Sequence, residues 1–283
     1  EFLREGEAIR DFKYPDRIII GSNNKKVFKK MELLYEPHIK KGAKFFCVSR
    51  KGAEMIKYAS NAFLATKITF INEIANLCEA TGINVEDVSV GMGSDARIGS
   101  RFLRAGPAYG GSCFPKDTKG LVSIADKFKT NLSIVKSVIK SNHSRKILLT
   151  KRINKIMNNK IKNKKITVLG VTFKANTDDM RESSSLVLIP YLLKKGAIVR
   201  YYDPSGFKEE FKKNKNLKFE RTLANACVGA DLIIINTEWD EFKSIDFKKV
   251  VKKNNFKIYD MRNLYNPIEL KRRNIKYYSV GRG

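Results

Sequence analysis

The spacing of hydrophobic residues changes twice along the chain. The first fifty residues hold two short apolar runs, 16–21 and 44–49, which predict strands, and a helical pattern over 23–39 between them. From Lys51 onward, apolar residues recur every three or four positions, which predicts one long amphipathic helix that ends at Gly82. We expect the opening segment to be the end of an α/β unit, followed by a helical region.

Helical spacing continues through the middle of the chain and is then replaced by alternating elements. Further helices are predicted over 85–90, 116–128 and 133–157, with a loop over 91–111 and a polar, basic linker over 158–165. Beyond the linker, four short apolar runs at 166–169, 198–202, 232–235 and 257–260 alternate with helical segments. This alternation is typical of βαβ units in a doubly wound parallel sheet. The predicted fold class is therefore α/β, with the end of a Rossmann-like domain over 1–50, a central helical domain over 51–158 and a second Rossmann-like domain over 159–283.

Composition narrows the possible classes of protein. The 283 residues are 42% hydrophobic and 30% charged, which is typical of a globular protein. We find no apolar run near the ~20 residues that a membrane span needs, and no signal peptide, so we expect no membrane partner. The four cysteines are scattered, with no pair or histidine spaced to bind zinc. We therefore expect no metal site and a reducing, cytoplasmic location.

The formal net charge of +27 raises the hypothesis of nucleic-acid binding. The lysines, however, are spread over almost every predicted surface, without interleaved aromatic residues or a recognisable nucleic-acid motif. We interpret the charge as a solvated, lysine-rich surface that also attracts small anions. No nucleic-acid partner is expected.

The octapeptide GGSCFPKD at 110–117 carries the strongest chemical signal. Pro115 suits the first turn of a helix, so Cys113 is predicted to lie at a helix N-terminus. The positive end of the helix dipole and the nearby Lys116 both favour a thiolate there, and Asp117 follows one turn later. A reactive cysteine is the functional interpretation, and an inert cysteine in a glycine-rich loop is the alternative.

Ligands of doubly wound sheets bind at the carboxyl ends of the strands. The predicted strand ends carry residues 170–174, 203–204, 237–240 and 260–262. No GxGxxG motif follows the first of these strands, and the glycines at 91 and 93 follow a helix, so we interpret them as a chance match.

The order and spacing of the motifs resemble those of the UDP-glucose dehydrogenase family, the NAD-dependent nucleotide-sugar dehydrogenases, along the whole length of the chain. Five stretches carry the resemblance: EFLREG at 1–6 with PDR at 15–17, IKYASNAF at 56–63, RIG at 97–99 with FL at 102–103, the cysteine octapeptide, and FK at 173–174 through DDMRES at 178–183. TEWD at 237–240 and DMRN at 260–263 add support.

The resemblance implies a chemistry in which NAD oxidises the C6 alcohol of UDP-glucose twice, through a thiohemiacetal and a thioester on Cys113, to UDP-glucuronate. Lys57 and Asn61, which share a helix face, would hold the oxygen of the tetrahedral intermediates. Asp117 would assist proton transfer, and Glu1 would promote hydrolysis of the thioester.

The family's binding residues carry over to further positions. The substrate-binding set comprises Phe2, Leu3, Glu5, Lys57, Asn61, Arg97, Phe102, Leu103, Arg104, Ala105, Gly106, Tyr109, Gly110, Phe173, Lys174 and Arg262. The cofactor-binding set comprises Glu5, Lys116 and Arg181. Arg97 matches a residue that family members contribute across a dimer interface, which implies a homodimer with shared sites.

One departure from the family stands out. Nearly all of the NAD-binding domain with its GxGxxG turn is missing before Glu1, so we expect this chain to be a fragment whose own hydride transfer is feeble. Two alternatives to UDP-glucose remain within the enzyme class, GDP-mannose and UDP-N-acetylhexosamines. A third alternative, from another class, is a substrate-binding or dimerisation module without turnover.

Overall fold

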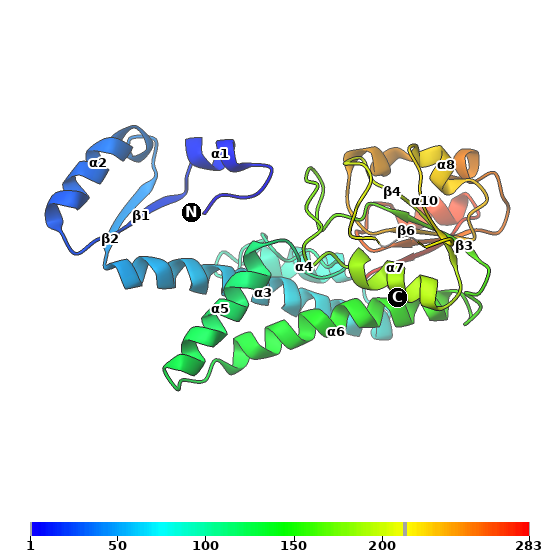
Figure 1. The fold of residues 1–283 in the computed structure, drawn as a ribbon, viewed down its shortest axis with the longest axis horizontal. Coiled ribbons are helices and arrows are strands. Elements are labelled where there is room, and N and C mark those ends of the chain that lie inside the picture. The colour runs from blue at the N-terminus through cyan, green and yellow to red at the C-terminus, as the bar shows by residue number, and fades with distance from the viewer. Residues whose placement is uncertain (1, 212–213, 283) are drawn as a thin grey trace.

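The computed structural model describes residues 2–211 and 214–282 as an elongated molecule (Figure 1). At its N-terminal end, a short helix, α1 (Ala8–Lys13), precedes two parallel strands, β1 (Arg17–Gly21) and β2 (Lys44–Val48), which helix α2 (Lys25–Ile39) connects. Among the described residues, these two strands pair only with each other. This part is therefore an incomplete α/β layer, as the sequence predicts.

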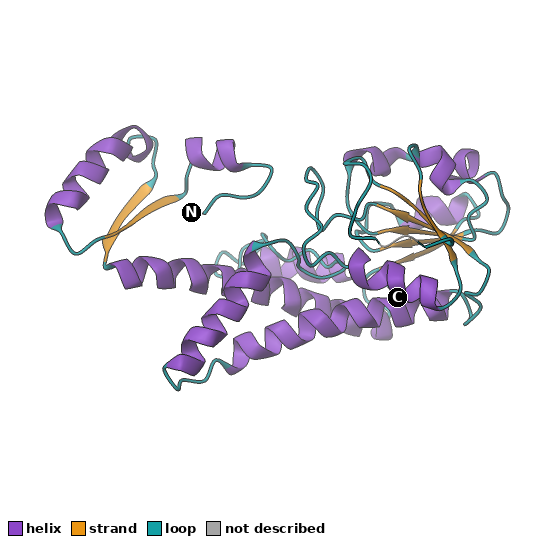
Figure 2. Ribbon diagram, viewed as in Figure 1, coloured by secondary structure: helices purple, strands orange, loops and turns teal. Residues whose placement is uncertain are grey.

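Helices make up the middle of the described part of the chain, and Figure 2 shows its strands at the two ends. Helix α3 (Arg50–Thr81) begins at Ser49, whose hydroxyl accepts the Gly52 N–H, and ends at Gly82 in a left-handed conformation. Its helical neighbours are α4 (Val85–Gly93), α5 (Cys113–Lys127) and α6 (Ser133–Ile156). Helices α5 and α6 both pack against α3.

The C-terminal part is a six-stranded parallel sheet in the order β5-β4-β3-β6-β7-β8. The strands are β3 (Lys165–Leu169), β4 (Ile198–Tyr202), β5 (Leu217–Phe219), β6 (Leu232–Ile235), β7 (Lys257–Asp260) and β8 (Lys276–Ser279). Helices α7 (Ser185–Lys194), α8 (Leu223–Cys227), α9 (Phe247–Val251) and α10 (Pro267–Arg272) and the 3₁₀ helix η1 (Asp240–Ser244) connect them. The order reverses between β3 and β6, so the crevice for a ligand lies beyond the ends of these two strands.

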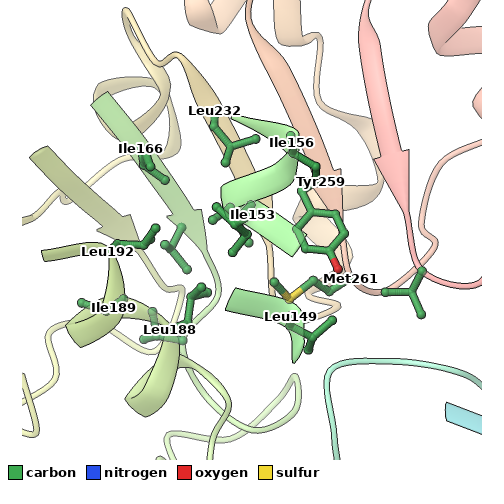
Figure 3. Packing of buried hydrophobic residues seen from close by; sticks show 14 of the residues in the cluster. Leu149, Ile153, Ile156, Ile166, Leu188, Ile189, Leu192, Leu232, Tyr259 and Met261 are labelled. Atoms are coloured by element: carbon green, nitrogen blue, oxygen red, sulfur yellow. The ribbon is translucent and has the colours of Figure 1, made fainter. Parts of the chain in front are cut away.

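Helix α6 joins the helical middle to this sheet. Its last turns place Leu149, Ile153 and Ile156 in the same core as Ile166 and Leu232 of the sheet (Figure 3). Helix α7 adds Leu188, Ile189 and Leu192 to this core. Because these side chains are almost completely buried, the sheet and the helices do not behave as loosely tethered units.

Most elements predicted from the sequence are confirmed, with a few corrections. Helix α5 begins at Cys113 itself, and α4 runs to Gly93, three residues beyond its predicted end. The predicted linker over 158–165 is a tight connection, because Ile161 is buried in the core. The sequence missed α1 and the two edge strands β5 and β8, since each is short and lacks a continuous apolar run.

Two further properties of the structure concern membrane spans and metal sites. No helix in the described ranges has the length and apolar character required to cross a membrane. Within the same ranges, no group of three or more His, Cys, Asp or Glu side chains is placed to hold a metal ion.

Candidate functional site

Cys113 is the first residue of α5, and its side chain is exposed. Ser112 precedes it without making a side-chain cap, and its hydroxyl lies 3.7 Å from Cys113 Sγ. The free N–H groups of the first helical turn point toward this end of α5. The structure therefore presents the thiol to solvent at the position that the sequence predicts.

A buried carboxylate lies one turn below the thiol. Asp117 is only 2% exposed, and its two oxygens accept hydrogen bonds from Asn61 Nδ2 at 2.5 Å and from Lys116 Nζ at 2.7 Å. Asn61 lies on α3, so this pair of hydrogen bonds joins the cysteine helix to the long helix. The Lys116 ammonium, in turn, has its pKa raised chiefly by this hydrogen bond to Asp117.

Lys57 lies one turn before Asn61 on the same helix. Its ammonium is 5.2 Å from the centre of the Phe2 ring, and the Arg17 guanidinium lies 4.1 Å from the same ring centre. The cation–π contact with Lys57 thus holds the N-terminal segment beside the α3 face that carries Lys57 and Asn61, and Arg17 of β1 adds a second such contact to the same ring.

The glycine pair before the cysteine packs tightly against the C-terminal part of the chain. A Cβ atom at Gly110 would lie 2.8 Å from the Glu182 carbonyl oxygen, and one at Gly111 would lie 2.7 Å from the Phe173 ring. The Gly111 N–H also donates to the Arg181 carbonyl at 2.7 Å. Both positions need glycine because larger residues would push the cysteine loop away from the segment over 173–182.

Residues 102–109 form the wall of the site ahead of the glycine pair. The Phe114 ring lies 6.1 Å from the rings of both Phe102 and Tyr109, measured between centroids. Burial raises the pKa of Tyr109 above its ordinary value, so its hydroxyl stays protonated at neutral pH. Leu103 and Ala105 are buried, whereas Arg104 is exposed and donates to the Arg262 carbonyl at 2.7 Å.

Arg262 follows β7 and reaches across the ends of the neighbouring strands. It donates to the carbonyls of Asn236 at 2.8 Å and Phe173 at 2.9 Å, and it forms an ion pair with Glu238. Burial lowers the pKa of its guanidinium, although the group stays charged. Arg262 therefore lies at the crevice between β3 and β6, next to a narrow hollow lined also by Pro107, Gly110 and Thr172.

The N-terminal segment meets the loop that follows β3. Lys174 Nζ donates to the Glu5 carbonyl at 2.5 Å, and Thr177 Oγ1 donates to the Glu5 carboxylate at 3.1 Å. Leu3 is exposed. Glu1, for which the family resemblance implies a role in thioester hydrolysis, lies outside the described residues.

Two arginines of the expected set lie at exposed positions. Arg97 has 89% of its side chain exposed and pairs with Asp95 at 2.5 Å, so in a single chain it points into solvent. Arg181 pairs with Asp179 at 2.8 Å and, like Lys116, lies close enough to Cys113 to interact with it electrostatically. The structure thus gathers most of the expected residues around the thiol and the β3–β6 crevice, and it leaves Arg97 pointing outward.

Sequence reasoning overlooked several polar residues that hold this site together. Asn72, Asn142 and Arg145 bond to the loop over 102–109, and Lys146 bonds to Glu182. A signal was available on α6, where Asn142 and Arg145 occupy the same helical stripe as the buried Val138 and Leu149. Polar residues at core positions usually have a hydrogen-bonding task.

The fold and the site define a class of α/β proteins: an exposed cysteine begins a helix, and the loop before it packs against the segment that follows the first strand of a doubly wound parallel sheet. Comparison with known families gives the class its name: the chain belongs to the UDP-glucose/GDP-mannose dehydrogenase family. Models of three domains of this family match it, the NAD binding domain over 1–39, the central domain over 51–144 and the UDP binding domain over 167–267.

Named relatives are consistent with this assignment. The chain is 46% identical over 285 residues to the UDP-glucose 6-dehydrogenase of Rickettsia felis and 44% identical over 287 residues to that of Rhizobium meliloti, and the alignments cover 99% and 100% of the chain. It also superposes with a TM-score of 0.87 and 30% identity on a UDP-glucose dehydrogenase from Pyrobaculum islandicum, over 100% of the chain. The chain spans 62 to 65% of the length of these relatives.

Proposed function

We propose that this chain is the substrate-binding and thiol-bearing part of an NAD-dependent UDP-glucose 6-dehydrogenase, which oxidises UDP-glucose to UDP-glucuronate. The observation that carries the proposal is the packing of Gly110 and Gly111 against residues 173–182. This packing holds the loop that leads to the exposed Cys113 against the segment after β3, and doubly wound sheets bind nucleotides beyond such strand ends, which supports a shared site. The two 6-dehydrogenases named above support UDP-glucose as the substrate.

The crevice between β3 and β6 offers cationic side chains that suit the diphosphate of a nucleoside diphosphate. Lys174 and Arg262 bring two cations to the ends of β3 and β7, and their backbone partners hold them in place. Phe2, Leu3 and Glu5 from the N-terminal segment, and residues 102–106 with Tyr109 and Gly110 from the loop, would contact the remainder of the substrate. Phe173 would complete this wall.

The proposed chemistry oxidises one carbon in two steps. The C6 alcohol first loses a proton and a hydride to give an aldehyde, and the Cys113 sulfur adds to the aldehyde carbon to form a thiohemiacetal. Loss of a second hydride from the carbon and of the hydroxyl proton gives a thioester, and water then releases the carboxylate and regenerates the thiol. Lys57 and Asn61 would stabilise the oxygen of the tetrahedral species, and Asp117 would move protons, directly or through water.

NAD, when bound, would accept the two hydrides. Two cations beside the thiol, Lys116 and Arg181, have side chains that are 71% and 62% exposed, so they can meet the anionic pyrophosphate of a dinucleotide. Glu5 would lie beside the same cofactor. The two-stranded sheet of β1 and β2 fits as part of the layer that binds it, in agreement with the NAD binding domain match over 1–39.

A homodimer is part of the proposal. Arg97 points into solvent in a single chain, which suits a residue that completes the site of a neighbouring copy. All four cysteines of the chain are free, so we place the enzyme in the reducing cytoplasm.

Other nucleotide sugars are the second candidates. A UDP-D-ManNAc dehydrogenase from Pyrococcus horikoshii superposes with a TM-score of 0.83 at 26% identity, so the fold alone does not choose the sugar. GDP-mannose is the other candidate within the family. A binding or dimerisation module without turnover is the alternative from another class.

The test combines calorimetry with an assay of NAD reduction. UDP-glucose, GDP-mannose and UDP-N-acetylmannosamine are each titrated into the chain and into Cys113→Ala, and NAD reduction is followed by absorbance. Binding of UDP-glucose to both forms, with about two reduced NAD per sugar only when Cys113 is present, supports the proposal. Tenfold tighter binding of another sugar would reassign the substrate. Binding without any reduction would mean that this chain is a substrate-binding fragment without turnover of its own, and no binding of any of the three sugars would overturn the proposal.

A further inference from the structure

The loop over 102–109, which leads to the glycine pair before the cysteine, is held in place by side chains rather than by a neighbouring strand. At Gly106, the backbone N–H donates to Asn72 Oδ1 at 2.8 Å, and the carbonyl accepts from Arg145 Nε at 3.2 Å. At Tyr109, the N–H donates to Asn142 Oδ1 at 2.9 Å, and the carbonyl accepts from Asn142 Nδ2 at 3.0 Å. Four backbone groups of the loop are therefore satisfied by three side chains of α3 and α6.

These side chains are nearly inaccessible to solvent, which makes their hydrogen bonds consequential. Asn72, Asn142 and Arg145 are 3%, 7% and 4% exposed. A buried backbone N–H or carbonyl that loses its partner is not rescued by water, so each bond determines where the loop can lie. The amide of Asn142 satisfies both backbone groups of Tyr109, much as a neighbouring strand would.

Arg145 reinforces this arrangement. Its hydrogen-bond acceptors are the carbonyls of Gly106 and Asn72 and the side chain of Asn76. Burial lowers its pKa to about 10, so it remains charged at neutral pH. A buried guanidinium that bonds to main-chain and amide oxygens fixes their positions at an energetic cost, which is consistent with a positioning task.

We propose that Asn142 is a positioning residue for the cysteine, acting through the backbone of Tyr109. Tyr109 directly precedes the glycine pair that leads to Cys113, and Gly106, held by Asn72 and Arg145, is the last residue of the continuous stretch 102–106 that we expect to contact substrate. The brace formed by Asn72, Asn142 and Arg145 therefore sets the distance between the thiol and the substrate. This inference rests on the proposed function for its catalytic meaning, although the brace itself can be tested without substrate.

The variants separate the two hydrogen bonds of Asn142. Asn142→Leu keeps the size of the side chain and removes both bonds, whereas Asn142→Asp keeps the acceptor for the Tyr109 N–H and loses the donor to its carbonyl. His143→Ala, at the exposed neighbouring position on α6, is the matched control. Thermal unfolding and circular dichroism identify any variant that fails to fold, and Asn142→Asp and Arg145→Lys provide milder substitutions in that case.

Hydrogen exchange of the peptide over 103–112 is the first readout. We expect exchange in Asn142→Leu to be about tenfold faster than in the original chain, with Asn142→Asp intermediate and His143→Ala unchanged. The second readout is the alkylation rate of Cys113 divided by that of Cys47, which is also exposed and lies far away in the sequence, on β2. This ratio should change in Asn142→Leu and stay constant in His143→Ala.

UDP-glucose calorimetry on the same variants links the brace to function. Weaker binding in Asn142→Leu, together with the exchange and alkylation changes, supports the inference. Unchanged exchange and an unchanged alkylation ratio in folded Asn142→Leu would overturn it. If the original chain does not bind UDP-glucose, the proposed function fails, while exchange and alkylation still decide whether Asn142 positions the loop.

Discussion

The side-chain amide of Asn61 donates a 2.5 Å hydrogen bond to Asp117, across the contact between α3 and α5. Both side chains are buried, and the second oxygen of Asp117 accepts from Lys116. The carboxylate is therefore partnered on both oxygens although solvent hardly reaches it. Since Asp117 lies one turn after Cys113, this bond also fixes how the cysteine helix sits on the long helix.

Asn61→Leu should destabilise the fold by about 2 kcal/mol, because it leaves one oxygen of the buried Asp117 carboxylate without its donor. Unfolding in urea measures the change. The double variant Asn61→Leu with Asp117→Leu should recover part of this loss, since it removes the buried carboxylate oxygen that Asn61→Leu leaves without a donor. A loss below about 0.5 kcal/mol for the single variant would mean that the bond adds little to stability.

Gly111→Ala should destabilise the chain more than Gly82→Ala. Both glycines have a φ of 76°, a value that strains any residue with a Cβ, so both variants carry a cost of this kind. A Cβ at Gly82 meets nothing within 4 Å, whereas at Gly111 it would lie 2.7 Å from the Phe173 ring. We expect Gly82→Ala to cost about 1 kcal/mol and Gly111→Ala about 1–3 kcal/mol more, measured by urea unfolding. Equal losses would show that the cysteine loop does not pack against Phe173 in solution.

Glu182→Gln should change how the free energy of unfolding depends on pH in the acid range. Hydrogen bonding to the Lys146 ammonium, followed by a weaker one to Lys119, lowers the pKa of Glu182 below its ordinary value of 4.5. Because the folded-state pKa is depressed, the stabilisation is fully present above pH 4.5 and is lost as the pH falls through the lower folded-state value.

The original chain should therefore be more stable than Glu182→Gln at pH 6, and this advantage should shrink at pH 3. Urea midpoints at the two pH values measure it, with Glu32→Gln, at an exposed position on α2, as the control. An advantage of the same size at both pH values would contradict the role of the Lys146–Glu182 pair.

Iodoacetamide should label two of the four cysteines in the folded chain. Cys47 and Cys113 are exposed, whereas Cys78 and Cys227 are buried, and burial raises the pKa of Cys227 to about 12. Mass spectrometry after brief labelling should find both exposed thiols modified, and all four should react in urea. Rapid labelling of Cys227 without denaturant would be incompatible with its position in the core.

Arg97→Ala and Cys113→Ala chains should complement each other if each site is shared between two copies. A mixed dimer then contains one site with an intact Cys113 and an intact Arg97 from the neighbouring chain. Random mixing of equal amounts should restore about one quarter of the sites, read as NAD reduction where the original chain supports it. If native mass spectrometry shows mixed dimers without any recovery, Arg97 does not act across the interface.

Local patterns of residues are enough to predict the order of the elements and the position of the thiol. Apolar periodicity located β1, α3 and the strands β3, β4, β6 and β7, because periods of two and 3.6 residues are local properties of the backbone. Pro115 and the glycine pair likewise placed Cys113 at a helix start, since capping and proline chemistry act within a few residues.

Which distant groups meet, in contrast, follows from the packing of the folded chain. Hydrogen bonds join residues that lie 33, 36 and 89 positions apart in the sequence: Asn142 with Tyr109, Lys146 with Glu182, and Arg262 with Phe173. Such contacts leave no periodic signal, because they depend on how the helices pack on one another and on the sheet. In the sequence, Asn142 and Arg145 are polar residues that interrupt the apolar stripe of α6. Their hydrogen-bonding role becomes clear only in the structure, where the loop over 102–109 lies against them.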